Sequence, residues 1–333
     1  MNEKMNNGKC RLHISHVWVD LDGVIPYVID DVFGINYDYN FGCNYDSERE
    51  LELYNFVKDC NEEMELVYTD FSPNERMREL ISEKKIRTLI FDHHEGVFDE
   101  LKTWANDKDY VMLELDVERS GTKIYYDWLL GGNKENKVLT EIVNLTDIYD
   151  LFRKERPLWD MATKLNRLMY YMMDYNMQTS TEVTEKYSPF ISSLSWKCTH
   201  MNTFKFSDYE MKKIEKSIKS EQEMFRDIDN GKIKIVTRQD EKGDYFLVLK
   251  VDKKVSAVAD YLLNKYKKVK YVLVVNDFDK DEMKISARCR DDFSVLNLEN
   301  ICGHEGAGGY NGVTNQICES LLNGELYSLK RLD

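Results

Sequence analysis

The fold of this chain is decided by the stretch at residues 12–23, LHISHVWVDLDG. Its first eight residues, Leu12 to Val19, are mostly apolar and predict a buried β-strand. Two aspartates, Asp20 and Asp22, follow directly, and His16 lies on the strand itself. Ligands of open α/β sheets bind beyond the carboxyl ends of the strands. If the strand stays regular, His16, Asp20 and Asp22 project to one side of the sheet.

The same pattern recurs in the first half of the chain. Strands are predicted at Glu65 to Thr69, Ile86 to Phe91 and Tyr110 to Leu115. Helices are predicted to begin between them at two capping boxes, Ser47 to Glu50 and Ser72 to Glu75, the second with proline at the first helical position. Alternation of strand and helix predicts a parallel α/β sheet.

The second half of the chain begins with helices and then returns to strands. Helices are predicted at Gly121 to Leu130, Val138 to Phe152, within Trp159 to Tyr187, and at Ser207 to Asn230. Further strands are predicted at Lys232 to Thr237, Tyr245 to Val251, Val269 to Val275 and Met283 to Cys289, with a helix at Ser256 to Tyr266. We therefore expect a first α/β domain over residues 1–195, a helical connector over 196–231 and a smaller α/β domain over 232–333.

Composition excludes several classes of protein. A chain of 333 residues exceeds the size of most single cores, and 42% hydrophobic residues is too many for a disordered chain. No apolar run approaches the roughly 18 residues of a membrane span, and the polar N-terminus has no signal core. Seven scattered cysteines without a Cys-x-x-Cys pair favour reduced thiols in the cytoplasm. The net charge of -14 favours a small anionic substrate over long duplex nucleic acid.

Acidic and histidine residues follow three of the predicted strands. Asp70 comes after the second strand, and Asp92, His93 and His94 come after the third. Histidine with several carboxylates and no thiolate is the ligand set expected for manganese or a similar ion. Carboxylates this numerous can hold two metal ions, which also offset the mutual repulsion of the acids. The sequence therefore predicts two divalent ions, Mn²⁺ being the first choice.

These residues resemble the motifs of a known family. Residues 15–23 resemble motif one of the DHH phosphoesterases, and Asp70 resembles motif two. Asp92-His93-His94 is the signature that names this superfamily, and residues 303–309, GHEGAGG, resemble the glycine-rich motif of the DHH-associated C-terminal domain. The motifs occur in the expected order, and the resemblance covers about residues 11–315. This chain has fewer glycines before His304 than the family usually has.

The resemblance implies roles for the residues of the first domain. His16, Asp20 and Asp70 would hold one metal ion, and Asp22, Asp70, His93 and a fourth-motif aspartate would hold the other. The oligoribonuclease-like branch has Tyr-Asp-x-Trp here, which favours Asp150, with Phe152 in place of the tryptophan, and leaves Asp147 as the alternative. Asp92 would orient a neighbouring imidazole, and His94 would lie near the substrate phosphate.

Other residues are implied to bind the substrate. Arg288, in a Ser-x-Arg strand, would grip a phosphate, with Arg290 as the weaker choice. Gly303 would allow close approach of the backbone to the ligand, and His304 would donate to it. The helix N-terminus at Ser120 to Thr122 would either face a phosphate or simply be capped by nearby residues.

The predicted function is metal-dependent hydrolysis of phosphodiester bonds in short oligoribonucleotides, linear dinucleotides or cyclic nucleotides. The resemblance implies that residues 1–195 form the catalytic domain, that residues 232–333 bind the substrate, and that the active site lies in the cleft between the domains. The main alternative is a nucleotide sensor or sequestering protein that keeps the pocket without turnover. A manganese-type pyrophosphatase would need a Lys- and Arg-rich C-terminal signature that the chain lacks. A processive exonuclease on long single strands fits poorly with the acidic charge and the compact length. The oligomeric state stays open, a homodimer included.

Overall fold

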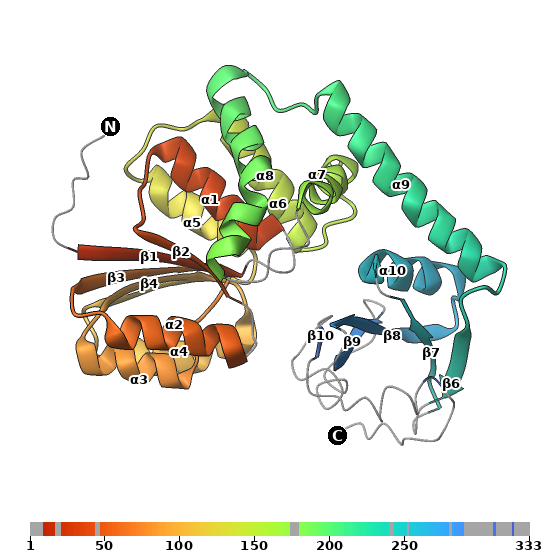
Figure 1. Cartoon of the computed structure of the whole chain (residues 1–333), viewed down its shortest axis with the longest axis horizontal. Coiled ribbons are helices and arrows are strands. Elements are labelled where there is room, and N and C mark those ends of the chain that lie inside the picture. The colour runs from red at the N-terminus through yellow and green to blue at the C-terminus, as the bar shows by residue number, and fades with distance from the viewer. Residues whose placement is uncertain are drawn as a thin grey trace. The chain divides into compact units, whose positions relative to one another are not determined.

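The computed structural model describes residues 9–16, 21–43, 47–173, 180–239, 243–251, 253–279, 282–289, 309–310 and 322. The chain divides into two compact units, Met1–Ile214 and Glu215–Asp333 (Figure 1). The division lies within the long helix α9 (Asp208–Asp229). No helix of the described ranges is long and apolar enough to cross a membrane.

The first unit is built on a sheet of five parallel strands. The strands are β1 (Lys9–His16), β2 (Tyr39–Cys43), β3 (Glu63–Thr69), β4 (Arg87–Asp92) and β5 (Val111–Leu115), in the order β2-β1-β3-β4-β5. This arrangement confirms the predicted parallel α/β fold. Strand β2, at the edge, was not predicted, because it is short and contains Gly42 and the polar Asn40.

Helices cover both faces of this sheet (Figure 1). One face carries α2 (Ser47–Asp59), α3 (Glu75–Lys84) and α4 (Phe98–Ala105), with the short 3₁₀ turn η1 (Glu95–Val97) before α4. The other face carries α1 (Leu21–Phe33), α5 (Gly121–Leu130), α6 (Lys137–Asp150) and α8 (Ser180–His200). Helix α7 (Trp159–Met172) packs against α6 and α8.

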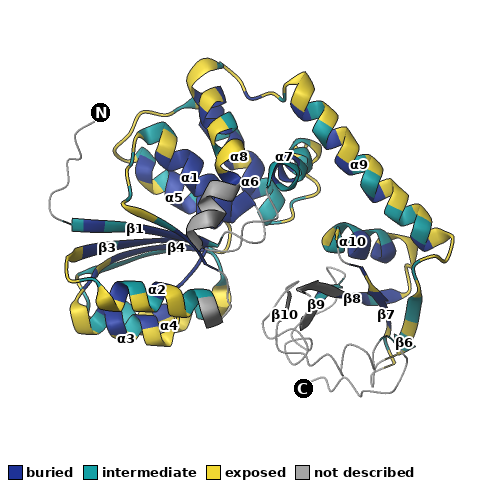
Figure 2. Cartoon of the chain, viewed as in Figure 1, coloured by how far each residue is buried: buried dark blue, intermediate teal, exposed yellow. Residues whose placement is uncertain are grey.

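The central strands β1, β3 and β4 are buried on both faces over most of their length (Figure 2). Leu12, Leu66 and Ile90 are completely buried on the face that α2, α3 and α4 cover. Each such side chain contributes about 1.5–3 kcal/mol relative to exposure. This layered core fixes where every strand ends, and therefore where the polar residues after the strands lie.

The start of helix α3 differs from the prediction. Its N-cap is Asn74, whose side chain accepts a hydrogen bond from the backbone N–H of Met77 at 2.9 Å. The predicted capping residue, Ser72, instead donates its hydroxyl to the carboxylate of Asp92. The sequence alone did not reveal this, because asparagine and serine are both good caps and only the fold brings Ser72 beside the end of β4.

The second unit contains a mixed five-stranded sheet. The strands are β6 (Ile235–Gln239), β7 (Tyr245–Lys250), β8 (Val269–Asp279), β9 (Glu282–Cys289) and β10 (Gly309–Tyr310), in the order β10-β9-β8-β7-β6. Among the described strand pairs of this unit, only β7 and β8 run parallel, across helix α10 (Val255–Lys265). The end of α9 and the buried face of α10 pack on one side of this sheet. A smaller α/β domain was predicted here and is confirmed.

Candidate metal centre

Polar side chains of the first unit meet at the carboxyl edge of its sheet. His16 is the last residue of β1, Asp70 follows β3 directly, and Asp92 is the last residue of β4. Parallel strands end at the same edge, so the sheet brings these residues together. Asp22 arrives differently from the prediction: it is the second residue of helix α1 and does not lie on a regular strand with His16. Asp150 is the last residue of α6.

His93 lies at the centre of this edge. Its Nε2 atom is 3.2 Å from Asp70 Oδ1, 3.5 Å from Asp150 Oδ2 and 3.8 Å from Asp22 Oδ2. The three carboxylates come from three different elements, so this convergence is a product of the tertiary fold. Two triads have ligand atoms within 4.8 Å of one another, Asp22 with His93 and Asp150, and Asp70 with His93 and His94. His16 Nδ1 lies 3.7 Å from Asp70 Oδ2.

The N-terminus of helix α5 holds the Asp22 carboxylate. The backbone N–H of Gly121 donates to Asp22 Oδ2 at 2.7 Å, and that of Thr122 donates to Oδ1 at 3.0 Å. The next N–H, of Lys123, donates to the N-cap hydroxyl of Ser120. Negative charge is favourable at a helix N-terminus, which stabilises the completely buried carboxylate. Since these donors are occupied, capping is the correct interpretation of this segment and phosphate binding there is wrong.

Glycine is required at position 121 because the backbone of Asp70 lies against it. A Cβ atom added to Gly121 would be 2.7 Å from both the Cα and the N atom of Asp70. Asp70 itself has a positive φ of 53°, a conformation that aspartate tolerates better than most residues. The sequence predicted the helix start at this segment but not the close approach, which joins residues far apart in the chain.

The structure separates the roles of the two candidate aspartates on α6. Asp147 accepts hydrogen bonds from the backbone N–H of Ser120 at 2.9 Å and from Arg153 Nη1 at 2.7 Å. Asp150, in contrast, lies beside His93 within one of the two triads. The geometry therefore places Asp150 among the candidate ligands and gives Asp147 a structural role at the start of α5.

Asp92 and His94 form a pair beside this group. Asp92 Oδ1 is 2.7 Å from His94 Nδ1 and also accepts the backbone N–H groups of His93 and His94 at 2.8 and 3.2 Å. Its other oxygen accepts the Ser72 hydroxyl. Asp92 therefore fixes the turn after β4 and the orientation of the His94 ring.

Burial and charge shift the pKa values of these groups. Burial raises the pKa of Asp70, but the imidazoles of His16 and His93 beside it outweigh burial and hold that pKa below its usual range. Burial lowers the pKa of His93, but the hydrogen bond with Asp70 and the charges of Asp150, Asp70 and Asp22 raise it to about 11. Burial also lowers the pKa of His94, but the charge of Asp92 and its hydrogen bond outweigh burial and raise that pKa above its usual value. The carboxylates therefore attract positive charge strongly.

The residues fit a divalent cation. The buried oxygen Oδ2 of Asp70 has no hydrogen-bond partner among the described residues. A buried acceptor without a donor is costly, and a cation would satisfy it. Oxygen and imidazole ligands without thiolate suit manganese and similar ions. Asp70 lies near both His16 and His93, so a cation at Asp70 would have an imidazole on either side.

The remaining predicted site residues fall outside the described part of the first unit. Asp20, Gly303 and His304 lie outside the described residues. Arg288 lies on β9 in the second unit, where it pairs in register with Val272 of β8. Ser72, Gly121 and Thr122 were not predicted as parts of the centre, although they hold Asp92 and Asp22 in place.

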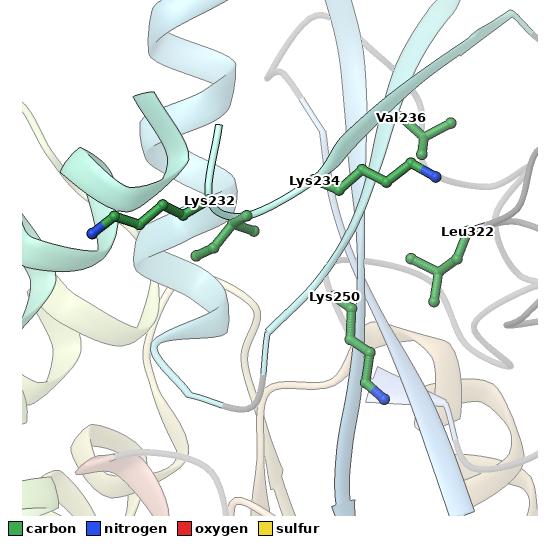
Figure 3. A pocket seen from close by; sticks show the side chains of 6 residues that line it. Lys232, Lys234, Val236, Lys250 and Leu322 are labelled. Carbon is green, nitrogen blue, oxygen red and sulfur yellow. The ribbon is translucent and has the colours of Figure 1, made fainter. Parts of the chain in front are cut away.

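A separate hollow of about 320 Å³ lies in the second unit and does not resemble this centre. It is lined by Lys232, Lys234 and Lys250 among others, and their ammonium groups point in different directions (Figure 3). Lys232 also pairs with Asp227 at 2.7 Å. The lysines do not converge on a common point, so the hollow is not a second candidate functional site.

Comparison with known proteins identifies the fold. A solved structure described as the DHH domain of a member of a family of ribosomal proteins superposes with a TM-score of 0.55 at 12% identity, covering 95% of this chain and 86% of that one. The chain has the fold of a DHH-domain protein. An uncharacterized protein from Helicobacter pylori G27 matches at 17% identity over 95% of this chain and 99% of that one, with a TM-score of 0.39. No protein-family model and no curated protein matches the sequence.

Proposed function

We propose that this chain is a divalent-metal-dependent phosphodiesterase that hydrolyses short oligoribonucleotides, linear dinucleotides or cyclic nucleotides. The observation that carries the proposal is the position of His93 Nε2, which lies 3.2–3.8 Å from the carboxylates of Asp22, Asp70 and Asp150. The DHH fold of the similar structure supports it, as do the sequence motifs that resemble the DHH phosphoesterases.

The proposed ligand sets divide the centre into two parts. Asp22, Asp70, His93 and Asp150 would hold one ion, and His16, Asp20 and Asp70 would hold the other. Divalent ions in such a site activate water and neutralise phosphoryl oxygens during in-line attack. Mn²⁺ is the first choice because its preferences match carboxylate and imidazole ligands.

The remaining residues would position the ligands and the substrate. The N-terminus of α5 fixes the Asp22 carboxylate through the backbone N–H groups of Gly121 and Thr122. Nδ1 of His94 lies 2.7 Å from Asp92 Oδ1, so we propose that the other ring nitrogen, Nε2, donates to a substrate phosphate. Arg288, with five N–H donors, is the proposed second phosphate contact.

The test is a panel of substrates with the purified full chain and Mn²⁺. The panel contains linear dinucleotides, RNA of two to ten nucleotides, cyclic mono- and dinucleotides and pyrophosphate, with products separated by chromatography. Asp70→Ala serves as the inactive control. We expect mononucleotide products that require both the metal and Asp70, and the fastest substrate then defines the specificity.

Two results would contradict the proposal. Absence of turnover on every phosphodiester, with metal and nucleotide binding demonstrated, would instead indicate a sensor or sequestering protein. Hydrolysis of pyrophosphate alone would indicate a pyrophosphatase.

A further inference from the structure

The turn that ends helix α6 contains a residue in an unfavourable conformation. The N–H of Arg153 bonds to the carbonyl of Ile148 at 3.0 Å, and the N–H of Phe152 bonds to that of Tyr149 at 3.2 Å. These two bonds define a Schellman motif, whose left-handed position is usually occupied by glycine. Here that position is Phe152, with a φ of 54°. A bulky side chain is strained in this region, and such strain concentrates at functional sites.

The surrounding structure holds this turn in place. Arg153 donates to Asp147 Oδ2 at 2.7 Å and to the carbonyl of Glu118, in the loop before α5. Phe152 follows Asp150 by only two residues, and the Asp150 carboxylate lies 3.5 Å from His93 Nε2. Two residues span at most about 7.6 Å between Cα atoms. A nucleotide whose phosphate is bound at the candidate metal centre is therefore long enough to contact Phe152.

The ring of Phe152 remains partly open to solvent and lies in a small aromatic group. Phe152 is 37% exposed. Its ring meets Trp159 edge-on at 5.4 Å between centroids, and the ammonium group of Lys154 lies 4.2 Å from its centroid. Trp159 in turn stacks on Tyr149 at 5.8 Å, and Asn166 donates to the Tyr149 hydroxyl at 2.6 Å. The aromatic group is therefore preorganised.

We propose that Phe152, beside the ammonium group of Lys154, stacks on a base of the nucleotide substrate. The inference rests on the proposed function and adds that the substrate is recognised by a base as well as by its phosphodiester. Aromatic rings beside cationic groups are the usual means by which proteins bind single-stranded nucleotides without reading their sequence. A base contact explains why a strained and exposed phenylalanine occupies a position suited to glycine.

The experiment compares Phe152→Gly with the unmutated full chain on two substrates, a linear dinucleotide and the same ribose–phosphate–ribose compound without bases. Loss of one stacking contact should raise KM for the dinucleotide about 5- to 150-fold. Both kcat and the KM for the base-free compound should stay unchanged. The melting temperature should stay constant or rise, since glycine relieves the strain. Phe152→Trp should restore the low KM.

Other outcomes separate the two proposals. If Phe152→Gly leaves the KM for the dinucleotide unchanged, or raises both KM values equally, the stacking proposal is wrong. A lower melting temperature with unchanged base preference would give Phe152 a structural role only. If the unmutated chain hydrolyses neither compound, the proposed function fails. In that case, dissociation constants of the same two compounds, measured by fluorescence titration, decide the stacking proposal by the same ratio.

Discussion

Substituting Gly121 by alanine tests how the centre is built. The added Cβ would lie 2.7 Å from backbone atoms of Asp70 and must move by about 0.7 Å to reach the 3.4 Å of ordinary contact. The same movement lengthens the 2.7 Å bond from Gly121 N–H to Asp22 Oδ2 beyond normal hydrogen-bond range. Overpacking costs about 1–3 kcal/mol and loss of a hydrogen bond to a charged group about 1.5–3 kcal/mol. We expect Gly121→Ala to lose about 2.5–6 kcal/mol of stability, the sum of these two costs.

The assay combines urea unfolding with Mn²⁺ titration by calorimetry. Gly132→Ala is the matched control, because a Cβ there has no neighbour within 4 Å, and its free energy of unfolding should change by less than about 0.5 kcal/mol. Gly121→Ala should bind Mn²⁺ about 10- to 100-fold more weakly, the range seen when the partners of metal ligands are removed. A Gly121→Ala chain as stable as the control, with unchanged Mn²⁺ affinity, would refute the close packing of α5 on Asp70 as the support of the centre.

Three further predictions concern the charged groups of the first unit. Asp150→Asn should weaken Mn²⁺ binding at least about tenfold and have little effect on the free energy of unfolding. Asp147→Asn should mainly lower stability, by about 1–3 kcal/mol, because it disturbs the hydrogen bonds to Ser120 and Arg153. Equal losses of Mn²⁺ affinity for the two variants in calorimetry would contradict the assignment of Asp150 as the ligand. Mn²⁺ must displace the proton that His93 holds with its pKa of about 11, so calorimetry in buffers of different ionisation enthalpy should show proton release. The Mn²⁺ affinity should rise up to tenfold per pH unit between pH 6 and 8. An affinity that does not change with pH would exclude His93 as a ligand. Lys197→Met should cost about 3–5 kcal/mol of stability at pH 7, because Lys197 lies 2.8 Å from the buried Glu210. Burial raises the pKa of Glu210, but Lys197 and Ser207 outweigh burial and hold that pKa below its usual value. The stabilisation is therefore present above the usual pKa of about 4.3 and is lost as the pH falls through the lower pKa of the folded state. A loss that stayed constant from pH 7 to pH 3 in urea unfolding would contradict that role.

The strands and the residues that follow them were predictable from the sequence because the signals are local. Apolar runs ending in Asp70 and in Asp92-His93-His94 indicate both a buried strand and its polar edge. A parallel sheet then requires these edges to coincide, so the topology alone predicts that His93 and Asp70 lie together.

The support of the centre was not predictable, because it depends on contacts between distant segments. Asp22 follows an apolar run and was expected on a strand, but it lies on α1, where the N-terminus of α5 binds it from 99 residues away. Whether Asp147 or Asp150 faces His93 depends on how α6 is rotated, and the sequence places both on one helical face. Sequence patterns report periodicity within an element and not the partner that it meets.

The most direct test of the central claim is a crystal structure of the chain grown with Mn²⁺ and measured at the manganese absorption edge. The account predicts an anomalous peak among the side chains of Asp22, Asp70, His93 and Asp150. If a chain that binds Mn²⁺ in solution shows no peak there, or shows the ion held by other residues, the proposed metal centre is wrong.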